Sequence, residues 1–193
     1  LFVFRGAGGN GLYPALFKDT TVDKFYYYVN GTQIDNIPMR HGEWIHVAIC
    51  RSSGTTRAFV DGALAGSFSD STNYVCRDLY IGMSDGNSHG IYGFVSNFRI
   101  VKGSALYTAD FTPPTSPLKN VTNTILLCAN SSTSATASTV TPSTITAIGS
   151  PIATRNELTG SIVLAVPGIS TATGANLVTN GHFDTDTSGW SSF

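Results

Sequence analysis

Hydrophobic and polar residues alternate along the first two thirds of the chain in short runs that are typical of β-strands. Residues 25–29, 43–50 and 79–82 are examples of such runs. Asn30-Gly31 follows the run at 25–29 and Asp61-Gly62 follows another at 57–60, and these dipeptides are favoured in tight hairpin turns because both turn positions need positive φ. Strands that recur about every 8 to 12 residues with turn residues between them predict an all-β, antiparallel sandwich or barrel.

The run at residues 43–50 has two apolar faces. Alternate positions place Trp44, His46, Ala48 and Cys50 on one face and Ile45, Val47 and Ile49 on the other. A strand with two apolar faces is expected in the centre of a sandwich, since an exposed edge strand usually has one polar face. Residues 91–102 alternate in the same way and predict one long strand.

The composition changes after Cys128. Between positions 131 and 146, 11 of 16 residues are Ser or Thr. Such a tract suits a flexible linker, but residues 139–141 and 144–148 alternate as strands do, which favours a closing strand. We therefore predict a β-sandwich over residues 1–150, a connecting segment with a short strand over 151–175, and the start of a further β module over 176–193. The first residue, Leu1, lies inside a strand-like run, so we expect a fragment of a longer polypeptide.

The charge balance restricts the partners of the chain. The 193 residues include 11 Lys+Arg and 12 Asp+Glu, so the net charge is -1 and only 12% of residues are charged. A chain this neutral provides no field to hold a polyanion, which argues against nucleic-acid binding. No run of 18 apolar residues occurs, so we expect no membrane insertion. A hydrophobic share of 41% is enough for a real core and argues against disorder.

Candidate catalytic residues are few, and we expect no enzyme activity. The only two glutamates, Glu43 and Glu157, lie in unrelated segments, and the four histidines show no metal-ligand spacing. His46 is expected to be a core or rim residue rather than a ligand. The three cysteines lie far apart, and buried reduced thiols are favoured over a bridge between Cys50 and Cys76.

Calcium is the one cofactor that the sequence leaves open. Oxygen ligands are gathered at residues 85–88, where Asp85 and Asn87 are the candidate metal ligands, with Asp61 or Asp78 as supporting residues. Loops of this composition are more often ordinary turns, which is the favoured alternative. No other cofactor is expected.

The eight tyrosines are the remaining informative residues. A tyrosine ring combines an apolar surface with a polar tip, so a row of them suits a sugar-binding face, although each one taken singly is better explained as a core or half-buried residue. In Tyr26-Tyr27-Tyr28, however, at least one ring must face outward, because consecutive strand residues point to opposite faces.

Several segments together resemble a known family. Residues 42–48, Arg51 and residues 57–62 are similar to the "W-x-H-V-A…R…F-V-D-G" pattern of laminin-G-like domains in the concanavalin A-like lectin and glucanase superfamily. Residues 80–82, 93–108 and 111–114 resemble the version found in bacteriophage tail-fibre and other virion proteins. The resemblance covers about residues 1 to 148.

The resemblance implies a two-sheet antiparallel jelly-roll sandwich whose first strands are missing from this chain. The closely spaced Glu and Asp motif of the glucanase branch is absent, so hydrolysis is not implied. Loop positions used for sugar contacts in such lectins correspond here to Asp85, Asn87, His89 and Tyr92. Residues 176–184 and 189–190 are similar to the first strand of a jelly-roll carbohydrate-binding module.

The function that this resemblance implies is a non-enzymatic virion structural protein. We expect a segment of a phage tail fibre or external appendage, located outside the cell, that assembles with other virion proteins as a homo-oligomer, with a trimer favoured, and contacts glycans of the host surface. The alternatives are a purely structural capsid or baseplate decoration protein, and an accessory glycan-binding module of a secreted bacterial adhesin or enzyme.

Overall fold

The structure is a computed structural model that describes residues 1–5, 11–19, 21–76, 78–84 and 90–154. In these ranges the chain forms strands and turns, and none of them contains a helix able to cross a membrane. The chain divides into two compact units, which are described separately. The first consists of Leu1–Arg40, Ile45–Ile91 and Ala105–Pro113, and the second of His41–Trp44, Tyr92–Ser104 and Pro114–Phe193. The predicted all-β antiparallel fold is confirmed.

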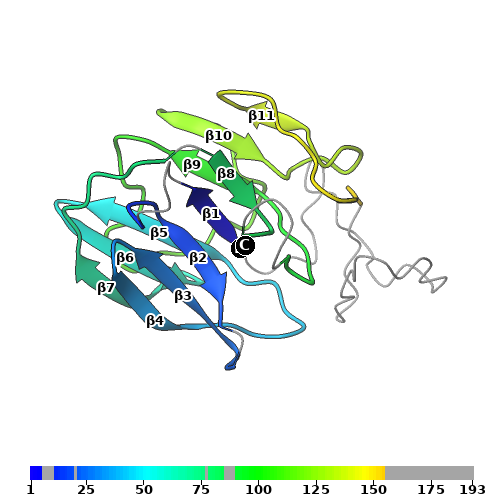
Figure 1. Cartoon of the computed structure of the whole chain (residues 1–193). Helices are drawn as coiled ribbons and strands as arrows, with labels where there is room; N and C mark the ends of the chain where they lie inside the picture. Colours follow the sequence, from blue (N-terminus) through cyan, green and yellow to red (C-terminus); the bar gives the residue numbers. More distant parts are fainter. Residues whose placement is uncertain (6–10, 20, 77, 85–89, 155–193) are drawn as a thin grey trace. The chain divides into compact units, whose positions relative to one another are not determined.

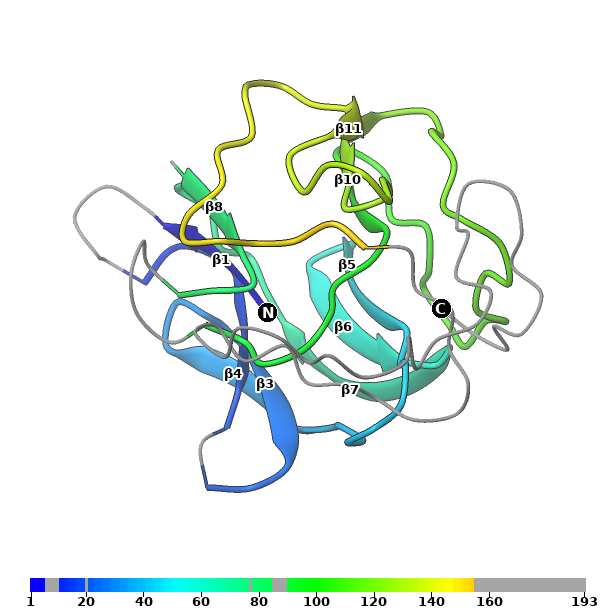
Figure 2. The same cartoon turned by 90° about the vertical axis from the view of Figure 1, so that its right-hand side faces the viewer.

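The first unit contains two antiparallel sheets (Figure 1). The larger has the order β4-β3-β2-β1-β8, with β1 at Phe2–Arg5, β2 at Ala15–Lys18, β3 at Lys24–Val29, β4 at Thr32–Pro38 and β8 at Asp78–Ile81. The smaller has the order β5-β6-β7, with β5 at Val47–Ser52, β6 at Thr55–Val60 and β7 at Ala63–Ser69. Figure 2 shows β3 and β4 on one side and β5, β6 and β7 on the other.

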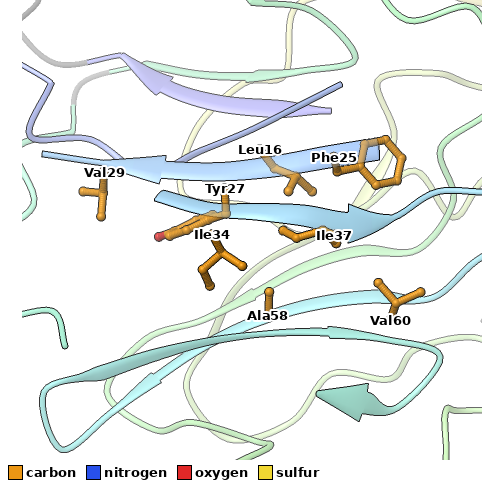
Figure 3. Close-up of a cluster of buried hydrophobic side chains, with 8 residues drawn as sticks. All are labelled: Leu16, Phe25, Tyr27, Val29, Ile34, Ile37, Ala58 and Val60. Carbon is orange, nitrogen blue, oxygen red and sulfur yellow. The ribbon is translucent and has the colours of Figure 1, made fainter. Parts of the chain in front are cut away.

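The two sheets of the first unit enclose a common apolar core. Figure 3 shows the side chains that fill it: those of β2, β3 and β4 face those of β6, and together they are Leu16, Phe25, Tyr27, Val29, Ile34, Ile37, Ala58 and Val60. The inward face of β5, with Ile45 before it and Val47 and Ile49 within it, packs against this cluster. Alternation along each strand therefore buries one face of each sheet, as in a sandwich.

The hairpin turns follow the sequence prediction. Asn30 and Gly31 both have positive φ, 48° and 74°, and connect β3 to β4. Asp61 and Gly62 show the same pattern between β6 and β7. Positive φ at both central positions is the geometry whose twist matches that of paired strands, which explains why Asn-Gly and Asp-Gly occur here.

One close approach between the sheets requires glycine. Gly66 of β7 faces Ile34 of β4, and a Cβ on Gly66 would lie 2.5 Å from Ile34 Cγ2. Normal contacts between carbon atoms are about 3.5–4.0 Å. The absent side chain at position 66 thus allows β7 to approach β4.

A buried polar group lies directly after β7, next to the smaller sheet. Asp70, which is 3% exposed, accepts hydrogen bonds from Thr56 Oγ1 at 2.8 Å and Tyr74 Oη at 2.5 Å, and from the backbone N–H of Thr72 at 3.0 Å. The Arg51 guanidinium lies 4.1 Å from the centre of the Tyr74 ring, and one of its nitrogens is 3.6 Å from Asp70 Oδ1. The carboxylate is therefore well satisfied, as a buried charge must be.

The position of β5 corrects one expectation. We expected a central strand, but β5 lies at the end of the order β5-β6-β7. Its second apolar face is explained by the segment Ala105–Pro113, here called the covering segment, which lies on the outer face of this sheet. The ring of Phe111 packs 5.5 Å from that of Phe59, which is fully buried, and Tyr107 stacks on Phe111 at 3.5 Å.

Backbone contacts fix the covering segment in place. The N–H of Phe111 donates to the carbonyl of Gly62 at 3.0 Å, and the N–H of Leu64 donates to Asp110 Oδ1 at 2.9 Å. A Cβ on Gly62 would lie 1.8 Å from the Phe111 carbonyl oxygen, so only glycine fits at this turn. The hairpin turn between β6 and β7 thus serves as the attachment point of the segment.

The second unit contains a three-stranded sheet of order β11-β10-β9. Its strands are β9 at Phe98–Val101, β10 at Thr124–Cys128 and β11 at Ser138–Val140. The long strand expected over residues 91–102 is wrong, because only its last third pairs, with β10. Asn97, with φ of 53°, immediately precedes β9 and interrupts the extended backbone. In the Ser/Thr-rich tract a strand forms at 138–140, close to the predicted 139–141, whereas residues 144–148 form none.

The C-terminal expectations lie mostly outside the described residues. The strand expected in 151–175 and the β module expected over 176–193 fall within or next to residues 155–193, so both stay predictions. The three cysteines are free thiols, with Cys76 exposed, Cys50 partly buried and Cys128 buried. The expectation of buried reduced thiols is met by Cys128 and is wrong for Cys76, which is exposed.

Candidate functional site

The loop predicted to carry the site lies outside the described residues. Asp85, Asn87 and His89 all belong to the range 85–89, so their proposed roles in glycan and metal binding stay predictions. Tyr92 is described in the second unit, where its side chain is 62% exposed. That exposure leaves its ring accessible to a ligand.

The supporting residue Asp61 is committed to the fold. Its Oδ1 accepts the backbone N–H of His46 at 2.8 Å, and its Oδ2 pairs with the Arg40 guanidinium. Among the described residues, no group of three His, Cys, Asp or Glu side chains is placed to hold a metal ion. Calcium binding therefore stays a prediction for the loop alone.

His46 lies among aromatic rings, as expected for a core or rim residue. Its ring meets those of Phe111 and Tyr107 edge-on, with ring centres 5.5 and 6.3 Å away. These contacts join the outer face of β5 to the covering segment. They account for the aromatic and histidine residues of this part of the sequence without a ligand.

The tyrosine run of β3 provides a different candidate site. Tyr27 points into the core and is 2% exposed, whereas Tyr26 and Tyr28 point to the opposite face of the larger sheet and are half-buried. This confirms the expectation that the run must send rings outward. Cross-strand pairing brings Phe17 of β2 opposite Tyr26, and their ring centres are 5.3 Å apart.

The strand register extends this aromatic surface across the sheet. One cross-strand row contains Tyr80 of β8, Val3 of β1, Ala15 of β2 and Tyr28 of β3. Val3 and Ala15 are 2% and 0% exposed, so the middle of this row is covered, and the partly exposed rings of Tyr28 and Tyr80 stand at its two ends. We call Phe17, Tyr26, Tyr28 and Tyr80 the outer tyrosine face; all four belong to the first unit.

Polar groups border this surface on the edge strand β4. Gln33 lies directly opposite Tyr28, and its Nε2 donates to Asp35 Oδ1 at 2.6 Å. The register shifts between Phe25 and Tyr27, so one residue of β3 opposes two of β4, and Asn36 takes a positive φ of 63°. This bulge leaves Asp35 beside Tyr26 with its side chain exposed. We call Gln33 and Asp35 the polar edge pair.

The charges near Tyr26 favour its neutral form. Burial raises the pKa of the Tyr26 phenol, and the negative charge of Asp19 raises it further. The pKa of Asp19 is in turn lowered, first by the hydrogen bond from the Thr21 hydroxyl and then by the Thr21 N–H, so this carboxylate is ionised at neutral pH. A neutral phenol can both donate and accept a hydrogen bond.

The outer tyrosine face and the polar edge pair together have the chemistry of a sugar-binding surface. A pyranose ring has an apolar face of C–H groups that stacks on an aromatic ring, and hydroxyl groups at its rim that need hydrogen-bond partners. Tyr28 provides the ring, and Gln33 provides the partner next to it. The arrangement is suited to binding a ligand.

The polar edge pair was missed in the sequence, although a signal for it was present. If Asn30 and Gly31 form a two-residue turn, position 29 must pair with 32 and position 28 with 33. That register places Gln33 across from an outward Tyr28 without any structural information. Only the bulge at Asn36, which aligns Asp35 with the same surface, has no sequence signal of this kind.

A hollow lies in the second unit, in the connection between β10 and β11. Its volume is about 380 Å³, and it is lined by amide and hydroxyl side chains with one alanine: Asn130, Ser131, Ser132, Thr133, Ala137, Ser138 and Thr139. Several of these groups already bond one another, including Asn130 Nδ2 to Thr139 Oγ1 at 2.7 Å. Its lining contains no aromatic ring on which a sugar could stack.

Comparison with known proteins gives one family. A family model described as concanavalin A-like lectin/glucanases superfamily (Laminin_G_3) matches residues 2–109. No curated protein and no solved structure matches the chain. The matched range contains all five strands of the larger sheet, and with them the outer tyrosine face, whereas the hollow at residues 130–139 lies outside it.

Proposed function

The chain belongs to the concanavalin A-like lectin/glucanase superfamily, and from this membership we propose that it is a non-catalytic carbohydrate-binding module whose ligand lies on the outer tyrosine face. The observation that carries the proposal is the outward direction of Tyr26 and Tyr28 beside the polar edge pair. The family makes a carbohydrate the natural ligand class, and this surface offers aromatic rings and hydrogen-bonding groups side by side.

The shape of the surface determines how it binds. A sheet face buries one side of a ligand only, so the contact area per sugar is small and a single site binds weakly. Several copies on one particle would raise the overall affinity through effective concentration. An oligomer that displays this face repeatedly is therefore part of the proposal, with a trimer favoured.

We further propose that the module acts outside the cell on a phage tail fibre or similar appendage, where it contacts other virion proteins and glycans of the host surface. Support for this setting comes from the resemblance of residues 93–108 and 111–114 to tail-fibre sequences, and from a charge content of 12%. A purely structural decoration protein and an accessory module of a secreted adhesin or enzyme are the alternatives.

The proposal is tested by glycan binding of the full chain displayed in several copies on a streptavidin support. Tyr28→Ala should reduce binding at least tenfold, because it removes the ring on which the sugar stacks. Tyr92→Ala and His89→Ala are matched controls that remove a ring at the other candidate site. Thermal unfolding of each variant shows whether the fold is retained.

Each outcome of this experiment is decisive. Loss of binding in Tyr28→Ala alone supports the outer tyrosine face. Loss in Tyr92→Ala or His89→Ala, with Tyr28→Ala unchanged, moves the site to the loop at residues 85–92. A multivalent chain that binds no glycan refutes the carbohydrate-binding function and favours the structural role.

A further inference from the structure

The polar edge pair presents hydrogen-bond acceptors rather than donors. One N–H of the Gln33 amide is used by Asp35 Oδ1, and the Gln33 carbonyl oxygen and the second carboxylate oxygen of Asp35 are further acceptors on these two exposed side chains. Within the described part of the chain, Asp35 Oδ2 accepts no hydrogen bond. A ligand at this edge therefore meets two acceptors and at most one remaining donor.

The charged groups around the outer tyrosine face also disfavour an anionic ligand. Asp35 lies beside Tyr26 on one side, and Asp19 acts on the same phenol from the other. The cation nearest along the strand, Lys24, donates to Asn36 Oδ1 at 2.9 Å. Lys18 is balanced by Asp23, whose carboxylate is 3.6 Å away. Both of these lysines therefore have a local partner among the described side chains.

From these observations we infer that the ligand of the outer tyrosine face is a neutral or amino sugar, and that the polar edge pair excludes anionic sugars. Hydroxyl and ammonium groups donate to the free oxygens of Gln33 and Asp35. A uronate, sialate or sulfate group would place a negative charge beside the Asp35 carboxylate. Its oxygens would then face the oxygens of Gln33 and Asp35, and neither side could donate a hydrogen bond. This inference rests on the proposed function, and it adds the class of sugar.

The repulsion between the Asp35 carboxylate and the negative charge of an acidic sugar should have a measurable effect on binding. Repulsion between unit charges a few ångströms apart at a protein surface is enough to weaken binding about tenfold at low salt. The same term falls as salt screens exposed charges. Binding of a neutral sugar should depend little on salt.

The test is a glycan array in which each neutral glycan is printed beside its sulfated and its sialylated or uronate form. Only glycans whose binding depends on Tyr28 are compared, so that the readout concerns this face. We expect binding to the neutral or amino members and about tenfold weaker binding to the acidic partner of each pair. Asp35→Asn should reduce this discrimination to about twofold or less, because it removes the charge and keeps the shape.

Asp110→Asn is the matched control. It changes the net charge of the chain by the same amount, but Asp110 lies in the covering segment on the smaller sheet, and asparagine keeps the oxygen that accepts the Leu64 N–H. Discrimination should stay near tenfold in this variant. Equal loss in both variants would show a general effect of net charge and overturn the role of Asp35.

The two proposals fail in different ways. Glycans that bind through Tyr28 and prefer the acidic form would overturn the inference on sugar class while leaving the carbohydrate function intact. The absence of any glycan whose binding depends on Tyr28 would refute the placement of the site on this face, and the inference with it.

Discussion

The contact between Gly66 and Ile34 yields a quantitative prediction for the stability of the first unit. Gly66→Ala places a methyl group 2.5 Å from Ile34 Cγ2, although the φ of Gly66 is not positive and its backbone can accept alanine without strain. Ile34 Cγ2 is attached directly to Cβ, so it cannot turn away without changing χ1 of a side chain that is 5% exposed. The sheets must therefore separate locally by about 1 Å to restore a normal contact.

Two opposing effects determine the size of the change. Overpacking a core by one methyl group costs about 1–3 kcal/mol. Replacing glycine by alanine restricts the unfolded chain and stabilises by about 0.4–1 kcal/mol. The net expectation is a loss of about 1–2 kcal/mol in the free energy of unfolding. With an m-value of about 2 kcal/mol/M, the urea midpoint falls by about 0.5–1 M.

Urea denaturation followed by circular dichroism measures this change, with Gly93→Ala as the control. Position 93 has no positive φ and no neighbouring atom within 4 Å of an added Cβ, so alanine there should leave stability unchanged or slightly raised. A second comparison repeats Gly66→Ala in an Ile34→Ala background. Without Cγ2 the clash is gone, and the alanine at 66 should be neutral or stabilising by about 0.4–1 kcal/mol.

The reasoning is refuted by either of two results. One is a Gly66→Ala protein that is as stable as the unsubstituted chain. The other is an equal loss from Gly66→Ala in both backgrounds, which would show that the cost does not come from Ile34. A dependence on Ile34 establishes that this contact sets the spacing of β7 and β4.

Three further predictions concern the buried carboxylate, the thiols and the covering segment. Burial by itself raises the pKa of Asp70, but hydrogen bonds from tyrosine and threonine donors outweigh this effect and hold the pKa below its ordinary value of 3.8. The contribution of the Asp70 carboxylate to stability is therefore complete above pH 3.8 and is lost as the pH falls below this value. At pH 7 the free energy of unfolding of Asp70→Asn should be about 1.5–3 kcal/mol lower than that of the unsubstituted chain, and the two values should converge in acid. A difference that stays constant with pH would contradict this. A maleimide should modify the exposed Cys76 before Cys128, whose thiol pKa burial raises to about 11, and mass spectrometry of the labelled peptides tests the order. Gly62→Ala should release the covering segment and speed chymotrypsin cleavage after Phe111, whereas unchanged cleavage would show that the turn does not hold it.

Local signals in the sequence were sufficient for much of the larger sheet. The Asn30-Gly31 turn determines the register of β3 and β4, and alternation then separates Tyr27 from its two neighbours. These features depend on residues close together in the chain, where turn geometry and side-chain direction act directly. The same reasoning reaches Gln33 of the candidate site.

Long-range packing was the part that local patterns could not supply. The apolar outer face of β5 indicated a central strand, because no signal near residue 50 reveals that residues 105–113 return to cover it. Likewise, the sequence at Asn97 does not predict that residues 91–102, despite their alternation, form a strand only from residue 98. A strand needs a partner as well as a pattern, and partners distant in sequence are not encoded in the alternation.

The return of the covering segment affects the order in which the protein can fold. The hydrogen bond between Leu64 and Asp110 joins residues 46 positions apart in the sequence. In the chain, residues 92–104 of the second unit separate the covering segment from the preceding part of the first unit. During synthesis the hairpins from β2 to β7 can form as they leave the ribosome, but Phe59 stays uncovered until residue 113 has emerged. Covering Phe59 is therefore a long-range loop closure rather than a local hairpin event, and it must follow the hairpins in the order of synthesis.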